Sequence, residues 1–198
     1  KGLNTVSFLS QKSKGNPLYL KYLIDEIKGL PIVTLKLLEK LPEYSFNLSE
    51  YYSYLLSHLQ LREDVPQILS GVSFSLTKQE LKEITNSGEF VDESLQILSP
   101  VLKVNLSQSG YSIYHESFRR YIVDHLNSKS ISIDKKIFRP ILEWFETKNF
   151  FSHQKSYRYY LQFLHEGGAF DKILSILSQT FVTDSVVHGQ SWKLIEKN

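Results

Sequence analysis

Residues 101–115, VLKVNLSQSGYSIYH, interrupt an otherwise helical pattern in a sequence of 198 residues. Apolar and polar side chains alternate in its first half, as in a strand with one buried face: Leu102, Val104 and Leu106 against Lys103, Asn105 and Ser107. Residues 107–110 supply the turn of a β-hairpin. A single hairpin among helices restricts the chain to a mainly α fold with very little sheet.

Apolar residues recur at helical spacing on both sides of the hairpin. A short helix and an extended stretch are expected over 65–76, and further helices over 3–12, 17–28, 32–41, 48–61, 77–85, 89–98, 116–126, 133–148, 152–165 and 170–179. Three helices, a hairpin and a helix in this order predict a winged-helix domain with the hairpin as its wing. The helices that follow predict α-helical hairpins.

Local signals refine several of these helices. Asn16 and Ser49 are expected N-caps, and Thr77 with Glu80 forms a capping box. Pro140 should kink or break the helix over 133–148. The helical spacing also predicts two apolar faces: Leu20, Leu23, Ile24 and Ile27 in one helix, and Tyr157, Tyr160, Leu161 and Leu164 in another.

Composition excludes several classes of protein. The 23 basic and 21 acidic residues leave a net charge of +2, which gives no global attraction to nucleic acid or to an anionic membrane. The sequence has no Cys, so it forms no disulfide. No apolar run approaches the ~20 residues of a membrane span. We therefore expect a soluble cytoplasmic protein with no membrane contact.

Motifs for self-contained catalysis are missing from the sequence. It contains no GxxxxGK[ST], GxGxxG, HExxH or GxSxG pattern, and its six His residues show no metal-ligand spacing. No catalytic residue and no metal ligand is assigned on this basis. A helical enzyme of unknown type remains a formal alternative.

A winged helix raises the question of nucleic-acid binding. The helix before the wing, 89–98, carries Glu89, Asp92 and Glu93 and neither Lys nor Arg. An acidic helix in that position would be repelled by phosphates, so nucleic acid is not the expected partner. A winged-helix nucleic-acid-binding module stays open as an alternative, as does a nucleotide-free helical scaffold.

The stretch SKGNPLYLKYL, residues 13–23, contains Gly15-Asn16-Pro17 where a helix begins. Gly15 allows a sharp turn, Asn16 can cap the helix, and Pro17 suits the first helical position. This capping role accounts for the three residues without any ligand. His115 likewise stands at the start of a helix, where capping or surface exposure is an ordinary role for a histidine.

Taken together, these stretches resemble the STAND-class NTPases, which include the NACHT and NB-ARC families. SKGNPLYLKYLIDEI is similar to the helical lid that carries the family's GxP motif, and LPEYSFNLSEYYSYLL to the segment leading into its winged-helix domain. LKVNLSQSGYSIYHESFRRYIVDHL resembles the wing and last helix of that domain, and YYLQFLHEGGAFDKILSIL the first helical pair of the superhelical region. The resemblance covers most of residues 10–180.

The resemblance implies three regions: a helical lid over 1–44, a winged-helix domain over 45–128, and a helical connector that begins a repeat region over 129–198. It implies a nucleotide site at Gly15, Asn16, Pro17 and His115, with Pro17 on the adenine and His115 on the β-phosphate. The cofactor would be ADP or ATP, with Mg²⁺ held mainly by a P-loop domain upstream in the same chain. Walker A and Walker B are missing here, so these residues would not hydrolyse ATP alone.

The implied role is a regulatory nucleotide switch. The segment would close over nucleotide, couple the sensing of a protein ligand to homo-oligomerisation, and serve immune or antiviral defence signalling. These expectations follow from the resemblance and not from composition or periodicity.

Overall fold

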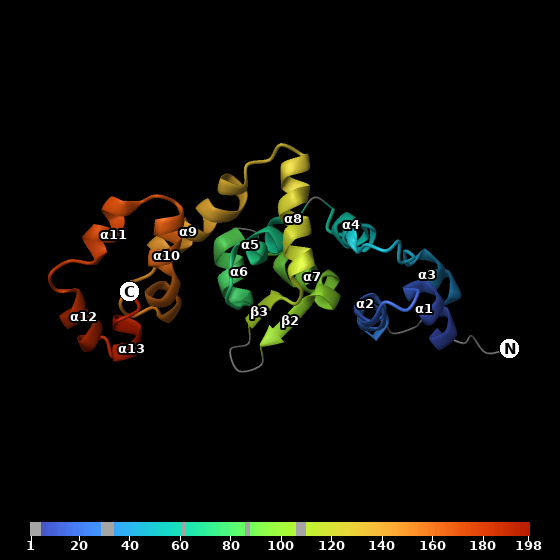
Figure 1. The fold of residues 1–198 in the computed structure, drawn as a ribbon, viewed down its shortest axis with the longest axis horizontal. Coiled ribbons are helices and arrows are strands. Elements are labelled where there is room, and N and C mark those ends of the chain that lie inside the picture. Colours follow the sequence, from blue (N-terminus) through green and yellow to red (C-terminus); the bar gives the residue numbers. More distant parts are fainter. Residues whose placement is uncertain (1–4, 29–33, 61, 86–87, 106–109) are drawn as a thin grey trace. The chain divides into compact units, whose positions relative to one another are not determined.

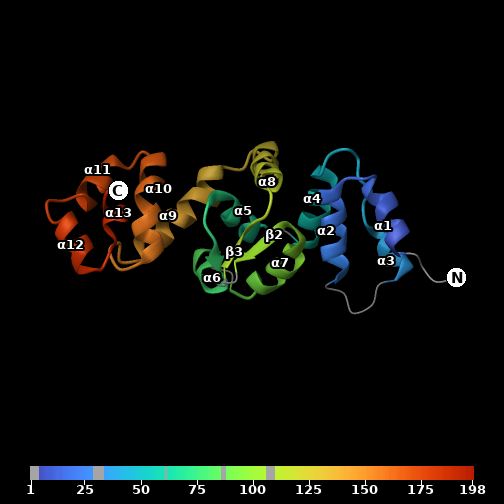
Figure 2. The same cartoon turned by 60° about the horizontal axis from the view of Figure 1, so that its bottom comes forward.

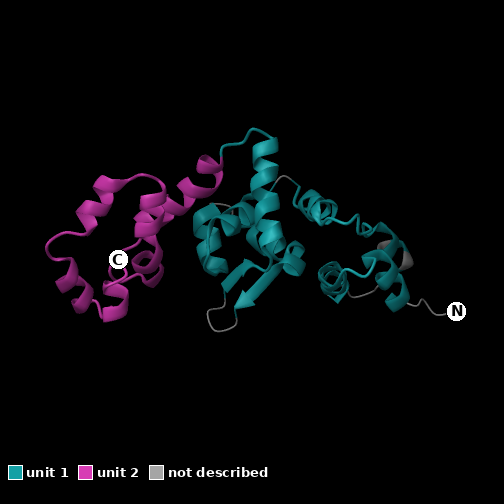
Figure 3. Ribbon diagram, viewed as in Figure 1, with its two compact units in different colours: residues 1–132 teal, residues 133–198 magenta. Residues whose placement is uncertain are grey.

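The computed structural model describes residues 5–28, 34–60, 62–85, 88–105 and 110–198. The chain forms two compact units, Lys1–Ser132 and Ile133–Asn198 (Figure 3). Helices dominate both units, and the first also contains a three-stranded antiparallel sheet (Figure 1). The predicted mainly α fold with a small β-hairpin is therefore confirmed. The predicted boundary between a lid and a winged-helix domain at residues 44 and 45 stays a prediction.

Four helices build the first part of the N-terminal unit: α1 (Thr5–Ser13), α2 (Pro17–Lys28), α3 (Leu35–Lys40) and α4 (Ser49–His58). α1 packs alongside α2 (Figure 2). The core of this part is built from tyrosine, since Tyr19, Tyr22, Tyr51 and Tyr52 are each at most 1% exposed.

This core corrects the predicted face of α2. Leu23 is buried as expected, but Leu20, Ile24 and Ile27 are only half-buried. The other two buried residues of α2 are Tyr19 and Tyr22. A tyrosine can replace leucine in a core when its hydroxyl finds a partner there, and a hydropathy pattern cannot show such a partner.

The second part of this unit has winged-helix topology. Its helices are α5 (Asp64–Gly71), α6 (Lys78–Thr85), α7 (Val91–Ile97), the 3₁₀ turn η1 (Ser99–Val101) and α8 (Glu116–Ser128). Its strands are β1 (Leu76–Thr77), β2 (Leu102–Asn105) and β3 (Gly110–Ile113), in the sheet order β1-β3-β2. β3 starts with glycine because a Cβ at Gly110 would lie 2.8 Å from the Cβ of Ser75.

The hairpin pairs Leu102 with Ile113 and Asn105 with Gly110. Leu102 is buried as the alternation predicts, but Val104 is 51% exposed. β2 is an edge strand of the sheet, so burial on its apolar face is confined to the end nearest η1. Leu106 and residues 107–109 of the predicted turn lie outside the described residues, as do residues 3–4, 32–33 and 61 of three predicted helices.

Unit 2 is entirely helical within the residues described there. It contains the π-helical turns η2 (Asp134–Phe138) and η3 (Ser156–Tyr160) and the helices α9 (Arg139–Glu146), α10 (Leu161–Glu166), α11 (Phe170–Ile176), α12 (Phe181–Val187) and α13 (Trp192–Ile195). Pro140 lies in the first turn of α9, directly after η2, where the Arg139 N–H bonds to the Asp134 carbonyl. The backbone is helical without interruption over 133–146, so no break is found at Pro140, which instead follows a change from π-helical to α-helical turns. The alternative, a kink, stays a prediction.

The predicted apolar face in unit 2 is also confirmed. Tyr157, Tyr160, Leu161 and Leu164 are all buried. The Tyr157 hydroxyl donates to Ser185 Oγ at 2.8 Å, which ties this face to α12. α11 packs back onto α10 as expected of an α-helical hairpin.

Of the two capping predictions in α4 and α6, one is correct and one is wrong. The Thr77 N–H donates to Glu80 Oε2 at 2.7 Å and the Glu80 N–H to Thr77 Oγ1 at 3.2 Å, which is a complete capping box. α4 instead has Leu48 at its N-cap, without a side-chain cap. Asn47 Oδ1 accepts from the Ser49 N–H at 2.5 Å, so an Asx turn replaces the expected Ser49 cap.

These two sites provide a test. Thr77→Ala should lower the free energy of unfolding by about 1 kcal/mol, because the Glu80 N–H loses its acceptor at the helix start. Ser49→Ala is the matched control and should change it by less than about 0.5 kcal/mol, the usual range for surface sites. Urea denaturation measures both. Equal losses in the two variants would contradict this assignment of caps.

Candidate functional site

The turn between α1 and α2 has the geometry that its sequence predicts. Gly15 has a φ of +80°, and the Asn16 N–H closes the turn on the Ser13 carbonyl at 2.8 Å. Asn16 Oδ1 accepts from the Tyr19 N–H at 2.8 Å, which makes Asn16 the N-cap of α2. Pro17 is the first residue of the helix and its ring is exposed. The first turn of α2 therefore presents an apolar surface to solvent.

His115 is the N-cap of α8. Its Nδ1 accepts from the Ser117 N–H at 3.2 Å and lies 2.7 Å from Ser117 Oγ. A backbone N–H can only donate, so Nδ1 is unprotonated in the neutral ring and the proton is on Nε2. The side chain is exposed. In His115, Nδ1 therefore caps the helix, and Nε2 carries an N–H that can donate outward.

The structure brings this cap close to α2. The Lys21 ammonium lies 4.3 Å from the centroid of the Tyr114 ring, the residue before His115. Lys21 is one helical turn beyond Pro17 and so lies on the same side of α2. The Tyr114 N–H bonds to the Val101 carbonyl at 2.8 Å, and α2 packs against η1, which contains Val101. Two of the predicted site segments thus lie in one region.

A chain of hydroxyl groups also connects α2 to His115. Tyr22 and Tyr52 approach at 3.5 Å between their oxygens, and the Tyr52 hydroxyl lies 2.6 Å from Ser117 Oγ. Ser117 in turn contacts His115 Nδ1. α2, α4 and α8 therefore contribute one polar group each to the chain behind the imidazole, and a shift of α2 against α8 would disturb it.

Sequence reasoning missed Lys21, Tyr114 and Tyr52 as parts of this region. The spacing of four residues between Pro17 and Lys21 was the available signal for Lys21. Tyr52 lies in the tyrosine-rich helix, where its role cannot be read without knowing its neighbours. Tyr114 lies beside His115 in the sequence, but the contact with α2 is purely tertiary.

The opposite half of α2 contains a partly buried carboxylate. Glu26 Oε2 accepts from the Tyr51 hydroxyl at 3.0 Å, and Oε1 accepts from the Tyr54 hydroxyl at 2.9 Å. Burial raises the pKa of Glu26 above its ordinary value, and the two tyrosine donors and His58 lower that pKa only in part. Burial likewise raises the pKa of Tyr51 and Tyr54, so both remain donors.

The acidic helix α7 is occupied by ion pairs within the protein. Asp92 lies 2.5 Å from Lys78 and 3.2 Å from Lys82, both on α6, and Glu93 lies 2.9 Å from Arg62. These three cations are therefore engaged with α7, and the helix itself presents carboxylates. This arrangement gives α7 no electrostatic attraction to phosphates.

Within the described ranges, no group of three or more His, Asp or Glu side chains is placed to hold a metal ion. The same residues include no helix that is both long and apolar enough to cross a membrane. Comparisons with protein-family models, with curated proteins and with solved structures gave no match for this chain.

The raised pKa of Glu26 predicts a pH dependence of stability. A carboxyl with a higher pKa in the folded state stabilises the fold fully below its unfolded pKa, and this contribution is lost as pH rises through the folded pKa. From about pH 4.5 upward, the wild type should therefore lose stability relative to Glu26→Gln. Urea denaturation between pH 4 and pH 7 measures the difference.

Glu50→Gln, at an exposed position of α4, is the matched control for removing a carboxylate from this region. The burial argument for Glu26 would be contradicted if the free energy of unfolding of wild type, relative to that of Glu26→Gln, stayed constant or increased as pH rises.

Proposed function

We propose that this chain is the regulatory, nucleotide-responsive segment of a STAND-class NTPase of the NACHT or NB-ARC type. In this proposal a P-loop domain of the same protein carries Walker A and Walker B and performs any ATP hydrolysis. The segment closes over the nucleotide and couples recognition of a protein ligand to homo-oligomerisation. The setting is cytoplasmic immune or antiviral signalling.

One observation carries the proposal. The His115 cap of α8 lies beside α2, the helix that begins with Gly15-Asn16-Pro17, and the Lys21–Tyr114 contact at 4.3 Å joins them. The resemblance assigns nucleotide contacts to both of these segments, although almost 100 residues separate them in sequence. Their proximity, in a unit with winged-helix topology, supports a shared site.

The residues present suit an adenine nucleotide. The exposed Pro17 ring offers an apolar face without a donor that competes with the base. The outward Nε2–H of His115 can donate to a phosphate oxygen. The Lys21 ammonium lies nearby, paired with Asp25 at 2.7 Å. Gly15 and Asn16 would shape the backbone around Pro17. Mg²⁺ belongs in the P-loop domain, because its usual ligands are phosphates and carboxylates at the catalytic site.

Control of the switch would follow from differential contacts. When bound, ADP or ATP supplies a polyanion that His115 can hold only when the winged helix is closed on α2. His115 therefore favours the closed state by the free energy of its phosphate contact, and a state without that contact gains nothing from it. Sensing of a ligand by the following helices would act by favouring the open state.

A nucleic-acid-binding winged helix is the less favoured function. Its recognition helix would be α7, whose Asp92 and Glu93 already engage Lys78, Lys82 and Arg62. Sequence-independent affinity for DNA that falls steeply with salt would support this alternative. A nucleotide-free scaffold would bind neither ligand.

The test uses the full-length protein that contains these residues, purified without added nucleotide. Denaturation followed by chromatography identifies and quantifies any nucleotide released. We expect near-stoichiometric ADP from wild type and at least about tenfold less from His115→Ala, the range for losing a hydrogen bond to a charged group. Resting oligomerisation should rise in the same variant.

Loss of the α8 cap must be separated from loss of the phosphate donor. His115→Ser retains a capping oxygen without the imidazole N–H, so it should release little ADP while keeping the stability of wild type. His165→Ala, at an exposed position of α10, is the control and should retain ADP. Equal ADP in all variants would refute the role of His115, and no nucleotide in wild type would refute the proposed function.

A further inference from the structure

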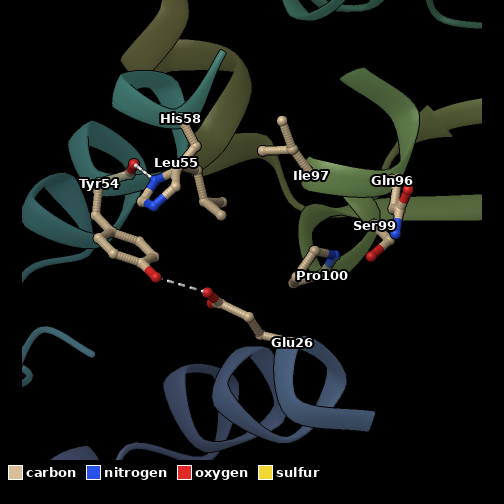
Figure 4. A pocket seen from close by; sticks show the side chains of 8 residues that line it. All are labelled: Glu26, Tyr54, Leu55, His58, Gln96, Ile97, Ser99 and Pro100. Atoms are coloured by element: carbon tan, nitrogen blue, oxygen red, sulfur yellow. Dashed lines mark hydrogen bonds between the residues drawn. The ribbon is translucent and has the colours of Figure 1, made fainter. Parts of the chain in front are cut away.

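A pocket lies at the opposite half of α2 from Pro17. Its volume is about 210 Å³, and it lies among α2, α4 and the α7–η1 segment (Figure 4). Polar and apolar side chains both line it. The lining residues are Glu26, Tyr54, Leu55, His58, Gln96, Ile97, Ser99 and Pro100. Neither the resemblance nor the proposed nucleotide switch uses this pocket.

The first wall provides hydrogen-bond acceptors. Glu26 is held by the Tyr51 and Tyr54 hydroxyls at 3.0 and 2.9 Å, one on each carboxylate oxygen. Each oxygen of an ionised carboxylate has a further acceptor direction. Figure 4 shows the Glu26 side chain rising from α2 toward the tip of Tyr54 at the edge of the pocket. The carboxylate is thus fixed in orientation and retains acceptor capacity.

His58 adds a second acceptor on the same side. Its Nδ1 lies 2.7 Å from the Tyr54 carbonyl, which can only accept, so Nδ1 carries the proton. In the neutral ring Nε2 then has a lone pair. The ring packs edge-on against Tyr54 at 4.4 Å between centroids, which limits its rotation. Glu26 and, in its neutral form, His58 therefore each offer a lone pair to the pocket.

The remaining surface is apolar with two amide or hydroxyl groups. Leu55, Ile97 and Pro100 form the apolar part, and Gln96 and Ser99 lie across the pocket from Tyr54 and His58 (Figure 4). The lining residues named above include neither Lys nor Arg. An ionised Glu26 carboxylate without a Lys or Arg beside it in the lining disfavours an anionic ligand and favours a cation.

We propose that this pocket binds a small organic cation, a protonated primary amine on a short apolar chain. The ammonium group would donate to Glu26 and to His58 Nε2, and the chain would pack on Leu55, Ile97 and Pro100. An ammonium has three donors and suits two converging acceptors. The volume sets the size, because an apolar cavity of about 150 Å³ holds benzene. The inference stands independently of the proposed nucleotide switch.

The probe is n-butylammonium, titrated into the 198-residue chain and followed by ¹H–¹⁵N NMR. We expect saturable shifts of the Leu55, Gln96 and Ile97 amides. n-Butanol has a similar shape without charge and should give no saturable shift at the same concentrations. Equal binding of butanol would show that the pocket binds apolar molecules without regard to charge, and would overturn the proposal.

Variants separate charge from shape. Glu26→Gln should weaken n-butylammonium binding at least about tenfold, because a charge-assisted hydrogen bond is lost. Glu50→Gln, outside the pocket, should leave binding unchanged. Tyr54→Phe keeps the carboxylate and removes one competing donor, so it should bind at least as tightly as wild type. Unchanged binding in Glu26→Gln would overturn the proposal.

The source of the amine is tested separately. Nα-acetyl-lysine methylamide presents the same ammonium on a bulky backbone and should bind more weakly than n-butylammonium if the ligand is a free amine. Binding of the lysine derivative without binding of n-butylammonium would refute a free-amine site and indicate a lysine side chain of a protein partner. Should Glu26→Gln fail to fold, the wild-type comparison of butylammonium with butanol still decides the question of charge.

Discussion

The N-terminal unit depends on tyrosine side chains that are buried together with their hydroxyl groups. A buried hydroxyl without a partner is costly, so each of these tyrosines must be matched by a specific acceptor or donor. Tyr19 donates to the Pro42 carbonyl and Tyr51 donates to Glu26. Tyr22 and Tyr52 approach each other, and Tyr52 also contacts Ser117. Aromatic packing supplies the apolar contact, and the hydroxyl contacts fix the orientation of the tyrosine rings.

Those partners lie on different helices, so satisfying the hydroxyls also positions the helices. Tyr51 with Glu26 fixes α4 against α2, and Tyr52 with Ser117 fixes α4 against α8. The cap of α8 is thereby held beside α2, where Lys21 covers the Tyr114 ring. A core of leucine and isoleucine would bury similar area, but it would fix the relative positions of these helices less firmly. The proposed nucleotide site therefore depends on the same hydroxyl network as the core.

α2 consequently has two chemically different environments along its length. Near Pro17 it meets the outward Nε2–H donor of His115, which suits an anion, while Lys21 is paired with Asp25. Near Glu26 it meets acceptors in an apolar pocket, which suits a cation. Burial that raises the pKa of Glu26 also makes its ionised form sensitive to any cation placed beside it. The two proposed sites are separable because their residues do not overlap.

The sequence by itself determined the features that depend on neighbouring residues: the start of α2 at Asn16-Pro17, the Thr77–Glu80 capping box, and one hairpin among helices. These signals act within a few residues, so no distant contact is needed to read them. Tertiary structure alone decided that Tyr19 and Tyr22 are buried in place of Ile24 and Ile27, and that Asn47 rather than Ser49 orders the start of α4. It also decided that Lys21 meets Tyr114 and that the partly buried Glu26 accepts hydrogen bonds from two tyrosines. Each of these depends on a partner from a different part of the chain or on a competing hydrogen bond, and hydropathy at helical spacing contains neither.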